Sequence, residues 1–395
     1  HQPVLLSHEH GFTYAAAGVQ GTSSAGAFSL AASIAGTIKD ATIVGTQMAL
    51  RSQIDYESAA RASSGGARAF RRTLDVVVEN MFQSSRKRME IDYFYGKSAL
   101  AQCIGSTAAV GSSEVTLTID KADWAAGIWA GMEGCAVTVF NATSATDQTP
   151  ALATHSGTIK SVNLVRSGAN YTITLENVGE TAAVAADAVI FFNTAAAVDD
   201  APTGSAAVSL NLFQGLHSIM SSTSSDSLFG IPCSNSLWQP NQLAAPAGVL
   251  NYKAISDAVA NVVAKGLDED LVCYINPLAW ALLMQQQDVD ARQSWVGNSP
   301  KSKTVGSDGV TFLAQNGKVS VKPSNYVKES QGFCIAPRLY KRIGATDLTF
   351  RLPDRGDEFF LHLQDKAGYE LRAYVNHSLF TKAPGKGILL TGLVG

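Results

Sequence analysis

The residues of this chain that could take part in acid–base or metal chemistry are scattered, and few are neighbours in the sequence. His8, Glu9 and His10 are consecutive. On an extended strand the two imidazoles would share one face and could act as two metal ligands. No third ligand lies near them in the sequence, so we interpret them as a polar contact of the N-terminal segment and predict no metal site.

Carboxylates gather at one further place, Asp268-Glu269-Asp270. Together with Asp354 and His362 they define the alternative of a β-rich hydrolase, because carboxylates and a histidine can perform general acid–base catalysis. That alternative requires these groups to meet in one pocket. No partner cluster accompanies the three carboxylates, so a solvated loop between a helix and a strand is the simpler interpretation.

The remaining motifs give no evidence of catalysis. Gly385-Lys386-Gly387 lacks the upstream glycine spacing of a phosphate-binding loop, and the sequence has no Gly-x-Ser-x-Gly nucleophile motif. Four histidines are isolated and are interpreted as surface or hydrogen-bonded groups: His155, His217, His362 and His377. We therefore predict no catalytic residue, no cofactor, no metal and no enzymatic activity.

The composition points away from a nucleic-acid-binding or disordered protein. Only 16% of the 395 residues are charged, the formal net charge is −3, and 46% are hydrophobic. A nucleic-acid-binding domain would be strongly basic, and a disordered chain would be poor in apolar residues. So few charges leave much neutral surface, which we expect partners to cover.

Neither disulfides nor a membrane span is predicted. The five cysteines are odd in number and form no Cys-x-x-Cys pair, so we expect reduced, buried thiols. No run of 18 apolar residues is present, and no membrane partner is predicted.

Two segments carry residues suited to contacts between subunits. Residues 1–38 hold a single charged residue, Glu9, and are too apolar for a solvated tail but too irregular for a domain. Residues 61–90 hold seven basic and three acidic residues, which could face phosphate, form intersubunit ion pairs or line a solvated helix. The candidate intersubunit contacts are Leu5, Leu6, Phe12, Phe28, Arg61, Arg68, Arg71, Arg72, Arg86, Lys87 and Arg88.

Hydrophobic periodicity then predicts the elements that position these residues. Apolar residues at helical spacing from Phe70 to Met81 predict a long helix over about 68–95. Short alternating runs over 104–195 predict a small antiparallel barrel or sandwich. Further on, the sequence predicts a helix over 251–265, a buried strand over 271–275, a helix opened by Asn276-Pro277, and a hairpin over 311–321. The last forty residues predict a long hairpin that turns at 365–368 and a final strand at 388–390.

This order of parts resembles the major capsid proteins of tailed bacteriophages, which have the HK97-like fold. The passage from Ala59 to Phe70, and the helix that ends Tyr93-Phe94-Tyr95-Gly96, are similar to the extended-loop-to-spine-helix passage of that family. Gly215-Leu216, Phe229-Gly230-Ile231 and Trp238 resemble the start of its axial domain. The implied fold class is α+β, with an N-arm, an extended loop, a long spine helix, peripheral and axial domains, and an inserted small all-β module.

The resemblance implies the following boundaries: 1–38 N-terminal arm, 39–69 extended loop, 70–103 spine helix of the peripheral domain, 104–198 inserted β-barrel or sandwich module, 199–224 peripheral-domain return, 225–350 axial domain and 351–395 peripheral-domain terminal strands. Maturation cleavage would suit His1 as first residue. Lysine–asparagine crosslinking is not carried over, because Lys39 is the single lysine of the expected loop.

The function that the resemblance implies is an icosahedral shell built from pentamers and hexamers around a phage dsDNA genome. Its partners would be copies of itself, portal, scaffold and decoration or cement proteins, and packaged dsDNA held non-specifically. It would be assembled in the host cytoplasm and located in the virion. The alternatives are an encapsulin-like nanocompartment shell protein, the β-rich hydrolase, and an adhesin that uses the 104–195 module.

Overall fold

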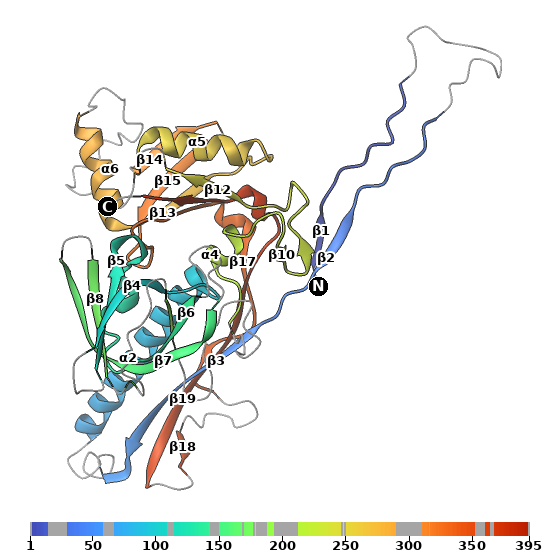
Figure 1. Ribbon diagram of the computed structural model, residues 1–395. Coiled ribbons are helices and arrows are strands. Elements are labelled where there is room, and N and C mark those ends of the chain that lie inside the picture. The colour runs from blue at the N-terminus through green and yellow to red at the C-terminus, as the bar shows by residue number, and fades with distance from the viewer. Residues whose placement is uncertain are drawn as a thin grey trace, which may run out of the picture.

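The structure is a computed structural model that describes the chain apart from residues 1, 15–29, 58–66, 109–113, 143–149, 168–169, 177, 179–187, 193–211, 246–247, 249, 290–309, 316, 352–359, 364–366 and 394–395. It combines two open sheets, a closed barrel, one long helix and a projecting two-stranded ribbon (Figure 1).

A six-stranded mixed sheet forms one end of the body, in the order β12-β20-β16-β13-β15-β14. Its strands are β12 Asn241–Ala244, β13 Leu271–Ile275, β14 Val310–Ala314, β15 Gly317–Pro323, β16 Gly332–Ile335 and β20 Ile388–Thr391. Helix α5, Tyr252–Val263, covers one face with Ile255, Val259 and Val262, and Asn251 caps it by accepting from the Ala254 N–H at 2.8 Å. Helix α6, Pro277–Val289, starts after Asn276 as the sequence predicts.

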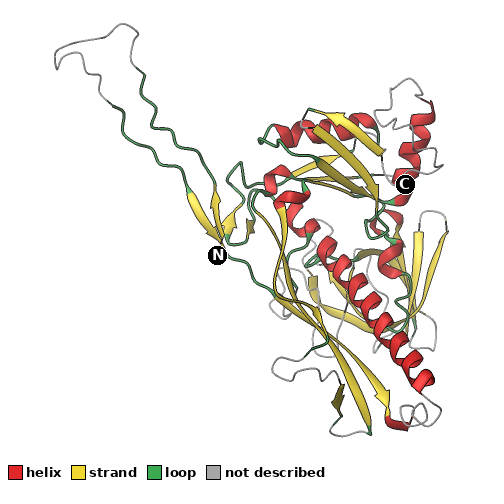
Figure 2. Ribbon diagram, turned by 180° about the vertical axis from the view of Figure 1, so that it is seen from behind, coloured by secondary structure: helices red, strands yellow, loops and turns green. Residues whose placement is uncertain are grey.

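The second open sheet runs along the long helix. Strand β19, Gly368–Thr381, is its centre and pairs with β17 Tyr340–Thr349, β18 Phe360–His362 and β3 Thr46–Asp55. Helix α2, Ala67–Tyr95, confirms the predicted long helix and packs Met81 against Leu371 and Ala373 of this sheet (Figure 2).

The predicted small β module is a closed antiparallel barrel. Its strand order is β4-β5-β8-β7-β6-β9, with bounds Ala101–Ala108, Val115–Asp120, Asn170–Glu176, Pro150–Ser167, Ala136–Ala142 and Val189–Phe192. Alternation fills its interior: Val115, Leu117 and Ile119 are buried along β5. The turn helix α3, Ala126–Trp129, adds Trp129, which stacks on Trp124 at 6.2 Å.

One hydrophobic core joins the barrel to the rest of the body. It contains Trp124 of the barrel, Tyr95 of α2 and Phe333 of the six-stranded sheet. The loop 324–331 supports this junction from the sheet side, because the Glu329 N–H donates to the Trp124 carbonyl at 3.0 Å. The short elements α4 Leu216–Met220, β10 Ser227–Leu228 and β11 Ile231–Pro232 pack beside it.

The N-terminal segment doubles back on itself as a ribbon. Strand β1, Gln2–Leu5, pairs with β2, Ile38–Ala41, and the two segments of the chain continue outward side by side. The Leu6 N–H donates to the Thr37 carbonyl at 2.8 Å, and the His10 N–H donates to the Ile34 carbonyl at 3.1 Å. Figure 1 shows this ribbon projecting far from the body.

Several expected boundaries need correction. The projecting part lies within 1–38, whereas residues 46–55, expected in the extended loop, form β3 because their alternating side chains suit a half-buried strand. The barrel starts at Ala101, inside the range expected for the spine helix. Strand β17 leaves the expected axial range for the sheet of β19.

The C-terminal segment also divides between the two sheets. The expected hairpin is confirmed over the described residues, because β18 pairs antiparallel with β19, from Phe360 opposite Leu371 to His362 opposite Tyr369. Strand β19 also pairs with β17 and β3, which the sequence did not predict. Strand β20, expected among peripheral strands, lies inside the six-stranded sheet between β12 and β16. Its run Ile388-Leu389-Leu390 is apolar on both faces, which suits an interior strand.

The expectation of reduced cysteines is wrong for two of the five. Cys273 and Cys334 are register partners on β13 and β16, their Cα atoms are 3.9 Å apart, and they form a disulfide. Sequence spacing could not show this, because the pair is 61 residues apart and is created by strand pairing. Cys103, Cys135 and Cys233 form no disulfide within the described residues.

Candidate functional site

The projecting ribbon is the most exposed apolar surface among the described residues. Phe12 is 71% exposed and Tyr14 is 90% exposed on the outgoing chain. Leu30, Ile34 and Ile38 are also exposed on the returning chain. Two strands alone have no second layer on which to bury such side chains, so the ribbon is built to be covered by another surface.

The base of the ribbon packs into the body, whereas the part that projects has exposed side chains. Val4, Leu6 and Ala41 are buried in the main core. Just after β2, the Thr42 N–H donates to the Phe229 carbonyl at 2.9 Å. Phe229 itself packs edge-on against Phe380 at 5.2 Å. The ribbon therefore leaves the body in a direction that the core defines.

The apolar contact candidates divide into two groups. Leu5 and Phe12 are exposed on the ribbon, as an intersubunit contact requires. Leu6 is 3% exposed and packs inside its own chain, so it leaves little surface for a neighbouring subunit. The one-residue shift along an extended strand turns it to the opposite face. Phe28 lies outside the described residues.

The basic candidates are only partly free for a partner. Arg61 lies outside the described residues; Arg68, Arg71 and Arg72 lie on α2, and their side chains are not described. Arg86 is exposed.

Lys87 and Arg88 contact the barrel of their own chain. The Lys87 ammonium donates to the Ala130 carbonyl, and burial lowers its pKa. Arg88 Nε lies 3.2 Å from Asp92 Oδ1, and its guanidinium lies over the Phe192 ring at 4.2 Å. Both side chains thus fasten the long helix to the barrel of the same chain.

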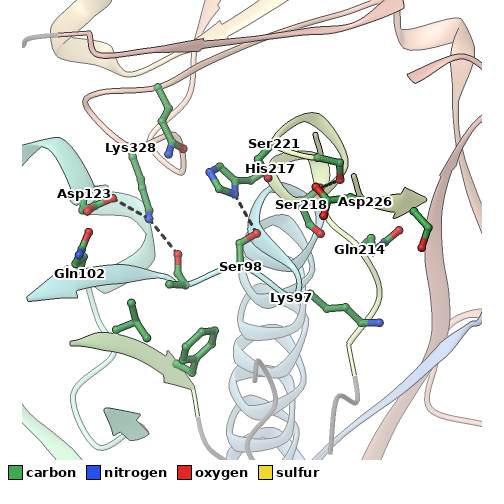
Figure 3. A pocket seen from close by; sticks show the side chains of 16 residues that line it. Lys97, Ser98, Gln102, Asp123, Gln214, His217, Ser218, Ser221, Asp226 and Lys328 are labelled. Atoms are coloured by element: carbon green, nitrogen blue, oxygen red, sulfur yellow. Dashed lines mark hydrogen bonds and ion pairs between the residues drawn. The ribbon is translucent and has the colours of Figure 1, made fainter. Parts of the chain in front are cut away.

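A polar cleft of about 450 Å³ opens where α2 ends, between the barrel, α4 and the loop 324–331. Figure 3 shows Lys97, Ser98, His217 and Lys328 around it. Lys328 is almost fully buried, and its ammonium donates to the Ala99 carbonyl at 3.0 Å and to Asp123 Oδ1 at 3.1 Å. The buried charge of the cleft is therefore compensated within the chain.

The cleft brings a serine and a histidine together, which tests the enzyme alternative. Ser98 Oγ lies 3.0 Å from His217 Nδ1, the arrangement of a nucleophile beside a base. Burial and the nearby Lys328 charge lower the pKa of His217 to about 4. An imidazole of that pKa is a weak base at neutral pH, so this pair fits a structural hydrogen bond.

The groups of the hydrolase alternative do not converge. Asp268 lies 3.8 Å from the Lys386 ammonium, and Asp270 Oδ1 accepts from the Lys318 N–H at 2.9 Å. His362 lies on β18 in the other sheet, against Tyr369. Asp354 falls outside the described residues. Within the described ranges, no three His, Cys, Asp or Glu side chains are grouped as a metal site would require, and no helix is long and apolar enough to cross a bilayer.

The residues that join the barrel, helix and sheet gave no signal in the sequence. Tyr95 accepts from the Lys328 N–H at 2.9 Å and donates to Gln331 Oε1 at 3.1 Å. Tyr171 of the barrel donates to Glu329 Oε1 at 2.8 Å. These partners are more than 150 residues apart in the chain. Lys328-Glu329 in an otherwise ordinary turn was the one available hint.

Comparison with known proteins identifies the fold. No protein-family model matches the chain, and no curated protein matches it. Among solved structures, the cyanophage A-1(L) capsid asymmetric unit is 7% identical with a TM-score of 0.50, covering 100% of this chain and 90% of that one. A virus-like particle from Pyrococcus furiosus aligns at 13% identity and a TM-score of 0.24, over 38% of this chain and 54% of that one. The holo-SrpI encapsulin complex from Synechococcus elongatus aligns at 11% identity and a TM-score of 0.27, over 41% and 56%.

The first of these alignments runs the length of the chain, so the predicted resemblance to phage capsid proteins is confirmed at the level of the fold. The other two span about half the length of the structures they match.

Proposed function

We propose that this chain is a major capsid protein that assembles into the pentamers and hexamers of an icosahedral phage shell enclosing dsDNA. In this proposal the fold is HK97-like, α2 is the spine helix, the four-stranded sheet belongs to the peripheral domain, and the six-stranded sheet belongs to the axial domain. The barrel is the inserted module. Portal, scaffold and decoration proteins would be partners, the shell would assemble in the host cytoplasm, and the chain would reside in the virion.

The observation that carries the proposal is the apolar ribbon, whose base is buried in the core and whose projecting side chains are exposed. Covering one large apolar side chain stabilises an association by about 1.5–3 kcal/mol relative to leaving it exposed. Phe12, Tyr14, Leu30, Ile34 and Ile38 are exposed together on one thin element. A contact in which one copy's ribbon lies on a different surface of the next copy is heterologous, and such contacts close into rings.

The experiment compares the full-length chain with a ribbon variant, Phe12→Ser, Leu30→Ser and Ile34→Ser combined. The wild type is expected to form particles far above 41.5 kDa by light scattering and electron microscopy. The ribbon variant is expected to stay small with an unchanged melting temperature, because these side chains contribute little to the core. Assembly of the variant at wild-type concentration would contradict the proposal.

A matched control removes polar groups from the same ribbon. His8, Glu9 and His10 are exposed, and their combined change to Ser should leave assembly intact. Purified particles are then analysed for contents: packaged nucleic acid supports the phage shell, whereas an enzyme cargo identifies a nanocompartment.

A further inference from the structure

His377 is a buried histidine on β19 whose ring makes only apolar contacts. It is 0% exposed, and neither ring nitrogen has a hydrogen-bond partner in the part of the chain that the structure describes. The ring lies edge-on to Phe213 at 5.0 Å and tilted against Tyr93 at 5.5 Å. A phenylalanine would satisfy this environment better, because it has no polar atoms to leave unpaired.

The position of His377 is the point where the ribbon leaves the sheet. On one side, His377 is the register partner of Thr46, which is the first residue of β3 and lies five residues after the end of β2. On the other side, the β17 ladder is irregular between Ile343 and Thr346. The start of β3, which leads from the ribbon, and the irregular part of β17 therefore both pair with β19 beside His377.

The neighbouring Asn376 shows how closely these segments approach. A Cβ on Gly344 would lie 1.9 Å from the Asn376 carbonyl oxygen, and a Cβ on Gly45 would lie 2.8 Å from Asn376 Oδ1. Glycine is therefore required at position 344, where the obstacle is backbone, whereas a side chain at position 45 would displace the Asn376 side chain. A small displacement of β19 here would be transmitted to the ribbon exit at Gly45 and to the bulge at Gly344.

The charged and titratable groups around His377 come from two elements. Arg342 on β17 forms an ion pair with Asp347, and Tyr93 and Asp92 lie on α2, where Asp92 pairs with Arg88. The flanking Thr46 of β3 and Phe213 carry no charge. Burial and the positive charge of Arg342 lower the pKa of His377 to about 4.

We propose that His377 is an acid-sensitive wedge: its uncharged ring packs β19 against Tyr93 of α2 and against Phe213, and its protonation by solvent loosens the sheet where the ribbon emerges. A charged imidazolium in this apolar site would lie beside Arg342 without a carboxylate of its own. The site must then open so that water reaches the ring. The inference concerns the single chain and does not depend on shell assembly.

The sign and range of the effect follow from linkage. The open state has the ordinary histidine pKa of 6.5, whereas the closed state has a value of about 4. As pH falls through this interval, the open state binds a proton that the closed state does not, so the open population rises. At pH 5 the expected increase is about 20-fold relative to pH 7, and the effect levels off as pH falls below the closed-state pKa of about 4.

The test is hydrogen–deuterium exchange of the unassembled full chain at pH 7 and pH 5, corrected for intrinsic exchange. Peptides covering 44–52 and 340–348 should show about 20-fold more opening at pH 5 than at pH 7, relative to peptides of β13. The variant His377→Phe keeps the ring contacts without a titrating nitrogen and should abolish this increase. An equal increase in His377→Phe, or none in the wild type, would overturn the proposal.

His217 is the matched control, because it is also buried with a pKa of about 4 but lies on α4 beside the cleft. The variant His217→Gln should leave the acid response of the 44–52 peptides unchanged. Should His377→Phe not fold, His377→Gln serves as the second uncharged variant. Histidine-selective NMR of the wild type gives an independent answer, since a His377 ring that titrates near pH 6.5 in the folded chain also overturns the proposal.

Discussion

The ribbon and the barrel are both β structure made from similar residues, yet they differ completely in burial. Trp124, Trp129 and Phe192 of the barrel are 0–2% exposed, whereas Phe12 and Tyr14 of the ribbon are 71% and 90% exposed. The barrel closes its own edges, so each strand has two neighbours and an interior face. The ribbon has two strands and no interior. The comparison separates the part of the chain that stabilises the subunit from the part that we expect to join subunits.

The largest effect is expected from the removal of a buried side chain of the barrel. Trp129→Ala should destabilise the chain by about 3–5 kcal/mol, because the large cavity cannot collapse inside a closed barrel. Since the stability of a typical protein is about 5–15 kcal/mol, this loss would remove a large fraction of the free energy of unfolding. Thermal and urea denaturation followed by circular dichroism measures the loss.

Val165→Ala is the control on the same barrel, since this side chain is 76% exposed. Its stability should stay within about 0.5 kcal/mol of the wild type. If Trp129→Ala were equally harmless, the barrel would not be part of the common core.

Within the ribbon itself, two neighbouring leucines differ in burial in the same way. Leu6 is 3% exposed in the core and Leu5 is 50% exposed. Leu6→Ala should cost about 2–3 kcal/mol, near the lower end for buried leucines because the ribbon base has few neighbours. Leu5→Ala should leave the melting temperature unchanged and weaken assembly, measured by light scattering at several protein concentrations. Equal melting temperatures for the two variants would show that the base of the ribbon is not anchored as described.

How far the sequence could predict this division depends on the range of the interactions. Local patterns were sufficient for α2, for the alternating barrel strands such as Val115–Asp120, and for the Asn276 cap, because each is set by neighbours within a few residues. The apolar, almost uncharged composition of residues 1–38 was also visible in the sequence.

The rest depended on pairings between distant residues. β3 was missed because its alternation is polar on one face and only half-buried on the other, a weak signal that becomes a strand by pairing with β19. The contacts of Lys87 and Lys328 required the barrel to be placed against the helix. Cys273 and Cys334 became partners through strand register alone.

The junction between helix and barrel gives the last and smallest test. Arg88→Lys keeps the positive charge near Asp92 but loses the planar guanidinium over the Phe192 ring. We expect a loss of about 0.5–1.5 kcal/mol, the range of a partly desolvated cation–π contact. Arg86→Lys, an exposed change two residues earlier on the same helix, should have no measurable effect in the same denaturation experiment. A loss in both variants would mean that helix propensity and not the barrel contact is responsible, whereas a loss in neither would mean that the barrel is held by its buried core and the loop 324–331 alone.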